Sequence, residues 1–218
     1  AKFEARKPVI TFDATELNKM FADLFSKPLL TELPEVSLPF SLDVSEFEAT
    51  NLKLAGASPV VIDELGLDAS MKASEVEIRR LDLKMPEATG SLKGRARLSG
   101  KWPLDLRANT RLSVAPVRGE KADVTLVGEV MGKVSLAAVA EGPVPAKFLL
   151  AADPATAGLP FSVTLVSPSL KLPLEGANPA DLTSLSAFSL RMSGDVRNWK
   201  LDAGLGVKAP GTPSATAG

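Results

Sequence analysis

Strict alternation of apolar and polar residues is the feature that most limits how this chain can fold. In the stretch that runs from Trp102 to Val114, the even positions are apolar except for Thr110, and the odd positions from Asp105 onward are polar or charged. Successive side chains of a β-strand point to opposite faces, so this stretch predicts a strand with one apolar and one polar side. Similar alternation recurs from about residue 36 to residue 207.

The recurring pattern predicts roughly a dozen short strands, separated mostly by Gly, Pro and Asp. Because no helical pattern lies between them, we expect an all-β protein with mostly antiparallel neighbours. Two architectures would hide the apolar faces. One is a closed sandwich or barrel, and the other is a single sheet folded lengthwise into a half-pipe that something else fills. Periodicity alone does not separate them.

Two interruptions of the alternation carry structural information. Pro39 lacks an N–H to donate to a ladder, so we expect its strand to lie at an edge or to contain a bulge. The apolar parity switches between Ile78 and Leu81, which predicts a β-bulge at Arg79 and Arg80.

One stretch near the start of the sequence has helical spacing instead. Asp13 and Glu16 have the spacing of a capping box, and Pro28 follows the end of the pattern. We therefore predict an amphipathic helix over about residues 14–25, either packed on the sheet as ordinary cover or covering an apolar groove. Its apolar stripe consists of Leu17, Met20, Phe21 and Leu24.

Composition excludes several classes of function. The 218-residue chain has no His, no Cys and no Tyr, which rules out Ser-His and Cys-His nucleophile pairs and zinc sites built on imidazole or thiolate. We therefore expect no enzyme activity, no cofactor and no metal. The net charge of −1 gives no reason to expect a nucleic-acid partner. We expect residues 1–208 to form one unit and residues 209–218, rich in Pro, Gly, Ala and Thr, to be a disordered linker or tail.

Two groups of charged residues are candidates for binding sites. Asp43, Glu46 and Glu48 lack the loop spacing of a known calcium site. The basic row Lys93, Arg95 and Arg97 could contact phosphate, but acidic residues lie nearby and aromatic stacking partners are missing. We interpret both groups as parts of a solvated face.

Three stretches carry a resemblance to a known family: LFSKPLLTELPEVSLPFSLDVSEF, from residue 24; GSLKGRARLSGKWPLDLRANTRLSVAPVRGEKADVTLVG, from residue 90; and AGLPFSVTL, from residue 157. Together they resemble the middle of the TamB family, the inner-membrane-anchored subunits of the translocation and assembly module, in the AsmA-like group. Full members are several times longer and carry an N-terminal membrane anchor, so we expect this chain to be an internal segment.

The resemblance implies a sheet called a β-taco, a half-pipe with an apolar interior, in the periplasm of a Gram-negative cell. It also implies phospholipid transport between the inner and outer membranes, assembly of some outer-membrane proteins, and an outer-membrane barrel partner, TamA, met through the distal part of the full-length protein.

We therefore expect a non-enzymatic bridge segment whose groove carries phospholipid acyl chains. The alternative is a binding or chaperone module for outer-membrane protein assembly that acts through exposed strand edges. The residues expected to line the groove are apolar, and nearly all fall within the predicted strands: Val36, Leu38, Phe40, Leu42, Val44, Leu67, Met71, Leu92, Leu98, Trp102, Leu104, Leu106, Leu112, Val114, Val124, Leu126, Leu136, Phe161, Val163, Leu165, Leu172, Phe188, Leu190, Met192, Leu201 and Leu205.

Overall fold

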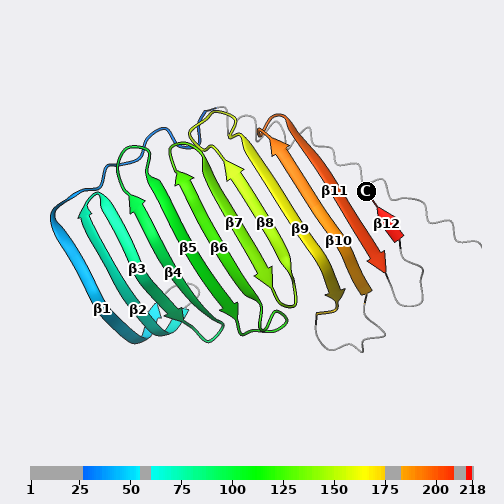
Figure 1. Ribbon diagram of the computed structural model, residues 1–218, viewed down its shortest axis with the longest axis horizontal. Coiled ribbons are helices and arrows are strands. Elements are labelled where there is room, and N and C mark those ends of the chain that lie inside the picture. The colour runs from blue at the N-terminus through cyan, green and yellow to red at the C-terminus, as the bar shows by residue number, and fades with distance from the viewer. Residues whose placement is uncertain (1–26, 55–59, 175–182, 209–214, 218) are drawn as a thin grey trace, which may run out of the picture.

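The chain forms one open antiparallel sheet. The computed structural model describes residues 27–54, 60–174, 183–208 and 215–217. Within these ranges it is a 12-stranded sheet whose strand order follows the chain (Figure 1). The strands are β1 (Leu38–Leu54), β2 (Val60–Ala73), β3 (Glu75–Lys84), β4 (Ala88–Arg97), β5 (Pro103–Leu112), β6 (Lys121–Glu129), β7 (Val134–Glu141), β8 (Ala146–Ala152), β9 (Phe161–Leu172), β10 (Thr183–Gly194), β11 (Trp199–Lys208) and β12 (Ala215–Ala217).

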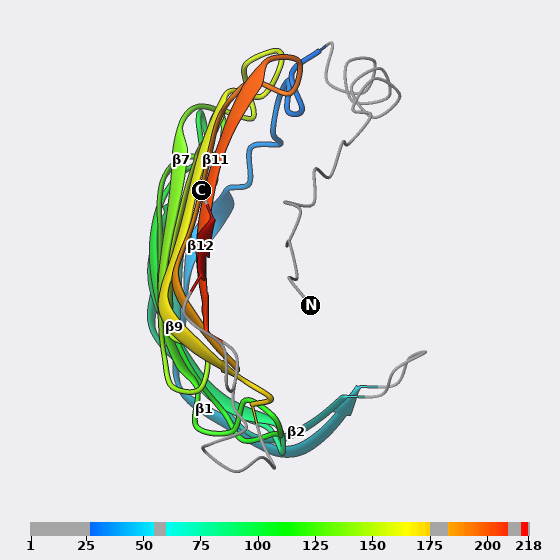
Figure 2. The ribbon, with the colours of Figure 1, turned by 90° about the vertical axis from the view of Figure 1, so that its right-hand side faces the viewer.

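The sheet is curved into a half-pipe and is not closed. Seen along the stacking direction, the strands follow an arc with a hollow side and a bulging side (Figure 2). The first and last strands lie at opposite edges and do not pair. At about 4.8 Å per strand, the hollow is roughly 55 Å long. This single sheet excludes the sandwich and confirms the half-pipe architecture.

Both interruptions foreseen in the sequence are present. The β1–β2 register shifts between Leu38 and Ser41, so the strand that contains Pro39 is both an edge strand and bulged. The β3–β4 register shifts between Ile78 and Leu81, which confirms the bulge at the two arginines. The extra residue restores the apolar side chains of β3 to one face.

Two strand predictions were wrong. Strand β8 was not foreseen, because its sequence AKFLLAA is apolar at positions of both parities and so lacks a clear alternation. Residues 161–165 and 170–174 were expected to form two strands, but Phe161–Leu172 is continuous, with Pro168 inside it. The expected tail also contains a short strand, since Ala215–Ala217 pairs with the end of β11. The helix expected over 14–25 lies outside the described residues.

Ion pairs tie neighbouring strands together on the bulging side. Arg79 of β3 donates from Nε to Asp68 of β2 at 2.7 Å and from an Nη to Asp43 of β1 at 3.0 Å, so one guanidinium joins three strands. The pKa of Asp43 lies below its ordinary value because the Ser45 hydroxyl and the Arg79 guanidinium donate to the ionised carboxylate. On the same face, Arg95 contacts Glu77 at 2.7 Å. The basic row therefore belongs to a solvated, paired surface.

The described residues contain no buried hydrophobic core. No aliphatic or aromatic side chain among them is buried, and large ones such as Leu42 and Leu201 are exposed. The one buried charged residue there is Glu120, which is 7% exposed. Its carboxylate accepts a hydrogen bond from the backbone N–H of Val144 at 2.8 Å and so links the β5–β6 and β7–β8 loops. In the described part of the chain, no second layer packs on the apolar face of the sheet.

Candidate functional site

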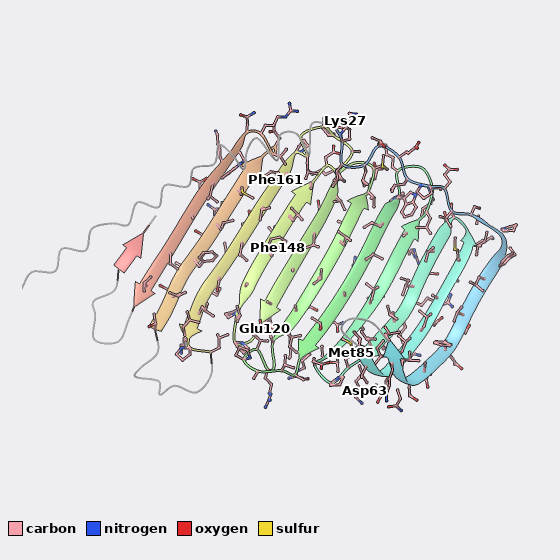
Figure 3. The ribbon with its side chains drawn as sticks, turned by 180° about the vertical axis from the view of Figure 1, so that it is seen from behind. Lys27, Asp63, Met85, Glu120, Phe148 and Phe161 are labelled. Carbon is pink, nitrogen blue, oxygen red and sulfur yellow. The ribbon has the colours of Figure 1, made fainter. Side chains whose placement is uncertain are left out.

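The candidate site is the apolar hollow of the half-pipe, here called the groove. Strand register places its side chains in rows that cross the sheet from β1 to β11 along the groove axis. The middle row contains only apolar residues and one glycine: Val44, Ala69, Ile78, Gly94, Leu106, Leu126, Leu136, Leu150, Val163, Met192 and Leu201. Figure 3 looks into the hollow side and shows Phe148 and Phe161 there.

The rows on either side have the same character. One is Leu42, Met71, Val76, Ala96, Leu104, Gly128, Val134, Ala152, Phe161, Gly194 and Trp199. The other is Phe47, Leu67, Leu81, Leu92, Ala108, Val124, Ala138, Phe148, Leu165, Leu190 and Ala203. These three rows contain no charged or polar side chain, which makes a continuous apolar wall.

Two polar residues, Thr110 and Ser167, lie on the same face beside these rows, and the hydroxyl of each is satisfied internally. Thr110 lies between Gly90 and Ala122, and its Oγ1 donates to the carbonyl of Thr89 at 3.0 Å. Ser167 lies opposite Phe188, and its Oγ donates to the carbonyl of Pro145 at 2.6 Å. Neither hydroxyl therefore needs a partner from the groove, and the wall offers an occupant only non-directional apolar contacts.

Most residues predicted to line the groove lie on this wall. Those in the three rows, or on the same face of their strands, are Leu42, Val44, Leu67, Met71, Leu92, Leu104, Leu106, Leu112, Val124, Leu126, Leu136, Phe161, Val163, Leu165, Phe188, Leu190, Met192 and Leu201. The structure thus brings residues up to about 160 positions apart in sequence onto one face.

All but one of the remaining predicted residues lie at strand ends, in turns or at irregular edges: Val36, Leu38, Phe40, Leu98, Trp102, Val114 and Leu172. Leu205 keeps the parity of Leu201 and so shares the groove face of β11, opposite the register shift of β10. Trp102 illustrates the physical reason. It precedes β5 in a turn with a φ of 53°, so it stands outside the regular alternation of that strand. Its indole N–H is buried without a hydrogen-bond partner in the described part of the chain.

Sequence reasoning missed several wall residues, above all Phe148 and Leu150 of β8. Their signal is the spacing Ala146, Phe148, Leu150, which has the required period of two. Leu149, on the opposite face and 53% exposed, obscured that signal. Small residues such as Ala138 were also missed, because Ala gives only weak evidence of facing an apolar interior.

An extended segment, residues 27–37, forms one rim of the groove, here called the strap. Its Val36 N–H donates to the carbonyl of Leu98 in the β4–β5 turn at 2.9 Å, and its Leu30 N–H donates to Pro154 in the β8–β9 turn at 3.0 Å. These turns are four strands apart, about 19 Å, and six residues reach at most about 20 Å. The strap is therefore close to fully extended and lies along the hollow side (Figure 2).

One comparison with known proteins decides the family. The family described as TamB, N-terminal domain, matches residues 3–217. This chain belongs to the TamB family. That family comprises membrane-anchored periplasmic proteins of the bridge and assembly type, and the curved sheet found here is the architecture expected of a TamB segment.

Two further findings complete the comparison. No solved structure matches the chain. In the described residues of this TamB domain, no helix has the length and apolar character needed to cross a membrane.

Proposed function

We propose that this TamB domain is a periplasmic bridge segment whose groove carries phospholipid acyl chains between the inner and outer membranes, without catalysing a reaction. The observation that supports the proposal most is the continuous apolar wall on the hollow side, combined with the lack of a buried hydrophobic core in the described residues. An acyl chain would supply the missing apolar layer, while the headgroup would stay in water at the open side.

The energetics suit this role. Each methylene removed from water contributes about 0.8 kcal/mol, so a fully shielded 16-carbon chain gains on the order of 10 kcal/mol. Equivalent positions repeat at each strand, about every 4.8 Å along the groove. Because apolar contacts are non-directional, an acyl chain could shift from one position to the next without breaking a specific bond. One domain of roughly 55 Å would need further segments in line with it to bridge a periplasm.

The helix expected over residues 14–25 fits this proposal as a groove cover. Leu30 donates its N–H to the carbonyl of Pro154 at the β8–β9 turn, so the residues that soon follow the expected helix in sequence lie at the rim of the groove. Replacing Phe21 and Leu24 with Ala should then increase binding of a fluorescent fatty acid. Unchanged binding together with lower stability would instead indicate a helix that only packs on the sheet.

Native mass spectrometry and lipid extraction of the purified domain test the main proposal. A conduit predicts co-purified phospholipid with no strong preference for one headgroup, since the wall contacts only acyl chains. A lipid-free domain that also fails to bind added phospholipid would contradict the proposal and favour the chaperone alternative.

A further inference from the structure

The groove has two long rims, one at each end of the strands. The strap lies along one rim, where it is bonded to the β4–β5 and β8–β9 turns. The other, here called the opposite rim, consists of the β3–β4, β5–β6 and β7–β8 turns, residues 85–87, 113–120 and 142–145. Figure 3 shows Met85 and Glu120 on the opposite rim and Lys27 at the start of the strap. The two rims differ in what they offer the headgroup of a bound lipid.

The opposite rim is built from turns that are bonded directly to one another. The Ser113 N–H donates to the carbonyl of Glu87 at 2.7 Å, which links the β5–β6 turn to the β3–β4 turn. The bond from Val144 to the Glu120 carboxylate links the β5–β6 turn to the β7–β8 turn. In the described part of the chain, no extended segment crosses these turns, so this rim has no obstruction like the strap.

The strap rim is unfavourable for a phosphate. Glu32 and Glu35 of the strap are exposed, so this segment presents two carboxylates to solvent beside the groove. Lys101 of the β4–β5 turn is already paired with Glu129 at 3.2 Å, whereas Lys133 of the β6–β7 turn is an exposed cation. A phosphodiester headgroup leaving on this side would meet both an obstructing segment and two like charges.

Arg118 gives the opposite rim a cation with a fixed position. It is exposed in the β5–β6 turn, and its Nε donates to the carbonyl of Ser113 at 3.2 Å. Within the described residues its Nη groups have no acceptor, and it forms no ion pair, not even with Glu87, the exposed acid of the neighbouring turn. The planar fork of a guanidinium matches two oxygens of a phosphate. Arg118 can therefore bind a phosphodiester without giving up a bond to the protein.

Strand β5 separates these two features. Val36 of the strap is bonded to Leu98 in the turn before β5, and Arg118 lies in the turn after it. The strand has 10 residues, which at about 3.4 Å each place the two turns roughly 30 Å apart along the curved wall. A headgroup bound near Arg118 is thus far from the strap.

We propose that phospholipid headgroups leave the groove along the opposite rim and that Arg118 binds their phosphate. This inference rests on the proposed function, because it assigns an orientation to the acyl cargo. The acyl chains would lie on the apolar wall, and the strap would prevent headgroups from leaving on its own side. Because every phospholipid carries this phosphate, the contact adds no preference for one headgroup over another.

Two fluorophore positions test the orientation. Ser113→Cys and Thr31→Cys each replace an exposed hydroxyl with a thiol, and the chain has no Cys of its own, so bimane can be attached at either rim. The labelled chain is loaded with phosphatidylcholine that carries a nitroxide on its headgroup and is then separated from vesicles. Because the rims are roughly 30 Å apart along the wall, quenching at residue 113 should be at least about threefold stronger than at residue 31. Equal quenching at both positions, or stronger quenching at residue 31, would overturn the proposal.

Arg118→Gln tests the phosphate contact. It should weaken binding of dioleoylphosphatidylglycerol about fivefold, and Arg118→Lys should restore part of that loss. Binding of dioleoylglycerol, which has the same acyl chains and no phosphate, should stay within about twofold. Lys133→Gln is the matched removal of an exposed cation on the strap side and should leave both affinities within about twofold. Equal losses for the two lipids, or in the Arg118 and Lys133 variants, would overturn the role of Arg118.

Failure of this proposal differs from failure of the conduit in the same assays. If neither dioleoylglycerol nor any phospholipid binds the chain, the conduit is wrong, and the orientation falls with it. If the lipids bind but the headgroup nitroxide does not favour residue 113, the conduit stands and the proposed orientation is wrong.

Discussion

A charge placed on the groove wall should separate an open conduit from an ordinary apolar core. Leu106 lies in the middle row, between Gly94 and Leu126, and is half-buried. Leu106→Asp removes the apolar contacts of a partly covered Leu, which should lower the free energy of unfolding by about 1–2 kcal/mol. Water in the open groove can hydrate the new carboxylate, so the larger penalty of a sealed, unpaired charge does not apply.

The loss of lipid should be much larger than the loss of stability. A hydrated carboxylate would keep about four or five methylenes of an acyl chain off the wall, at about 0.8 kcal/mol each. The resulting 3–4 kcal/mol corresponds to binding weaker by roughly two to three orders of magnitude. The assay is a urea unfolding curve together with a co-purified phospholipid count for the variant and the unmodified domain.

Arg107→Asp is the matched control, one residue away on the opposite face. Arg107 lies opposite Lys93 on β4, so a carboxylate there faces a cation in water. Its effect on stability should stay within about 0.5 kcal/mol, and its lipid count should not change. Equal lipid loss in both variants would refute the reasoning, because the effect would not be specific to the groove. Complete unfolding by Leu106→Asp would also refute it, because that result indicates a sealed core.

Three further predictions follow from local geometry. Gly94→Ala should lower the free energy of unfolding by about 1–3 kcal/mol, because φ is 150° there and a Cβ would collide with a backbone carbonyl. Gly66→Ala, where a Cβ meets no close backbone atom, should change the free energy of unfolding little. Urea unfolding curves measure both variants. Glu120→Ala should cost about 1–3 kcal/mol by removing the acceptor of the Val144 N–H, and Glu120→Gln should cost less in the same assay. Folding lowers the pKa of Asp43, so the ionised carboxylate should stabilise the folded sheet above its ordinary pKa of 3.8. This stabilisation should disappear as the pH falls through the lower pKa of the folded state. Hydrogen exchange of β1 measured against pH, with Asp43→Asn as control, tests this prediction.

Alternation predicted the wall well wherever one face was clearly apolar. Strands such as β5 contain apolar residues at one parity only, so the face of Leu104 and Leu106 followed from sequence. The bulge at Arg79 was also predictable, because a switch of parity has one common structural cause. These features depend on local spacing alone.

Features that depend on long-range geometry were not predictable in this way. Period-two alternation is the same in a closed sandwich and in an open half-pipe, so the uncovered wall could not be inferred from spacing. Trp102 stands in a turn with a φ of 53°, outside the regular alternation of β5, and spacing alone does not show where such a turn falls. The strap depends on hydrogen bonds between residues far apart in sequence, such as Leu30 to Pro154, which no local pattern encodes.

The stability of this domain and the proposed cargo are linked, because the described residues contain no buried hydrophobic core. Backbone ladders and ion pairs on the bulging side, such as those of Arg79, hold the strands together without apolar burial between layers. Any ligand that binds only the folded sheet stabilises it in proportion to the logarithm of its concentration. An acyl chain in the groove would therefore act as the second layer of the domain while remaining mobile, because it is not covalently part of it. If the groove carries acyl chains as proposed, the sheet would be most stable when the groove is occupied. Occupancy would also reduce the association of the apolar wall with other apolar surfaces.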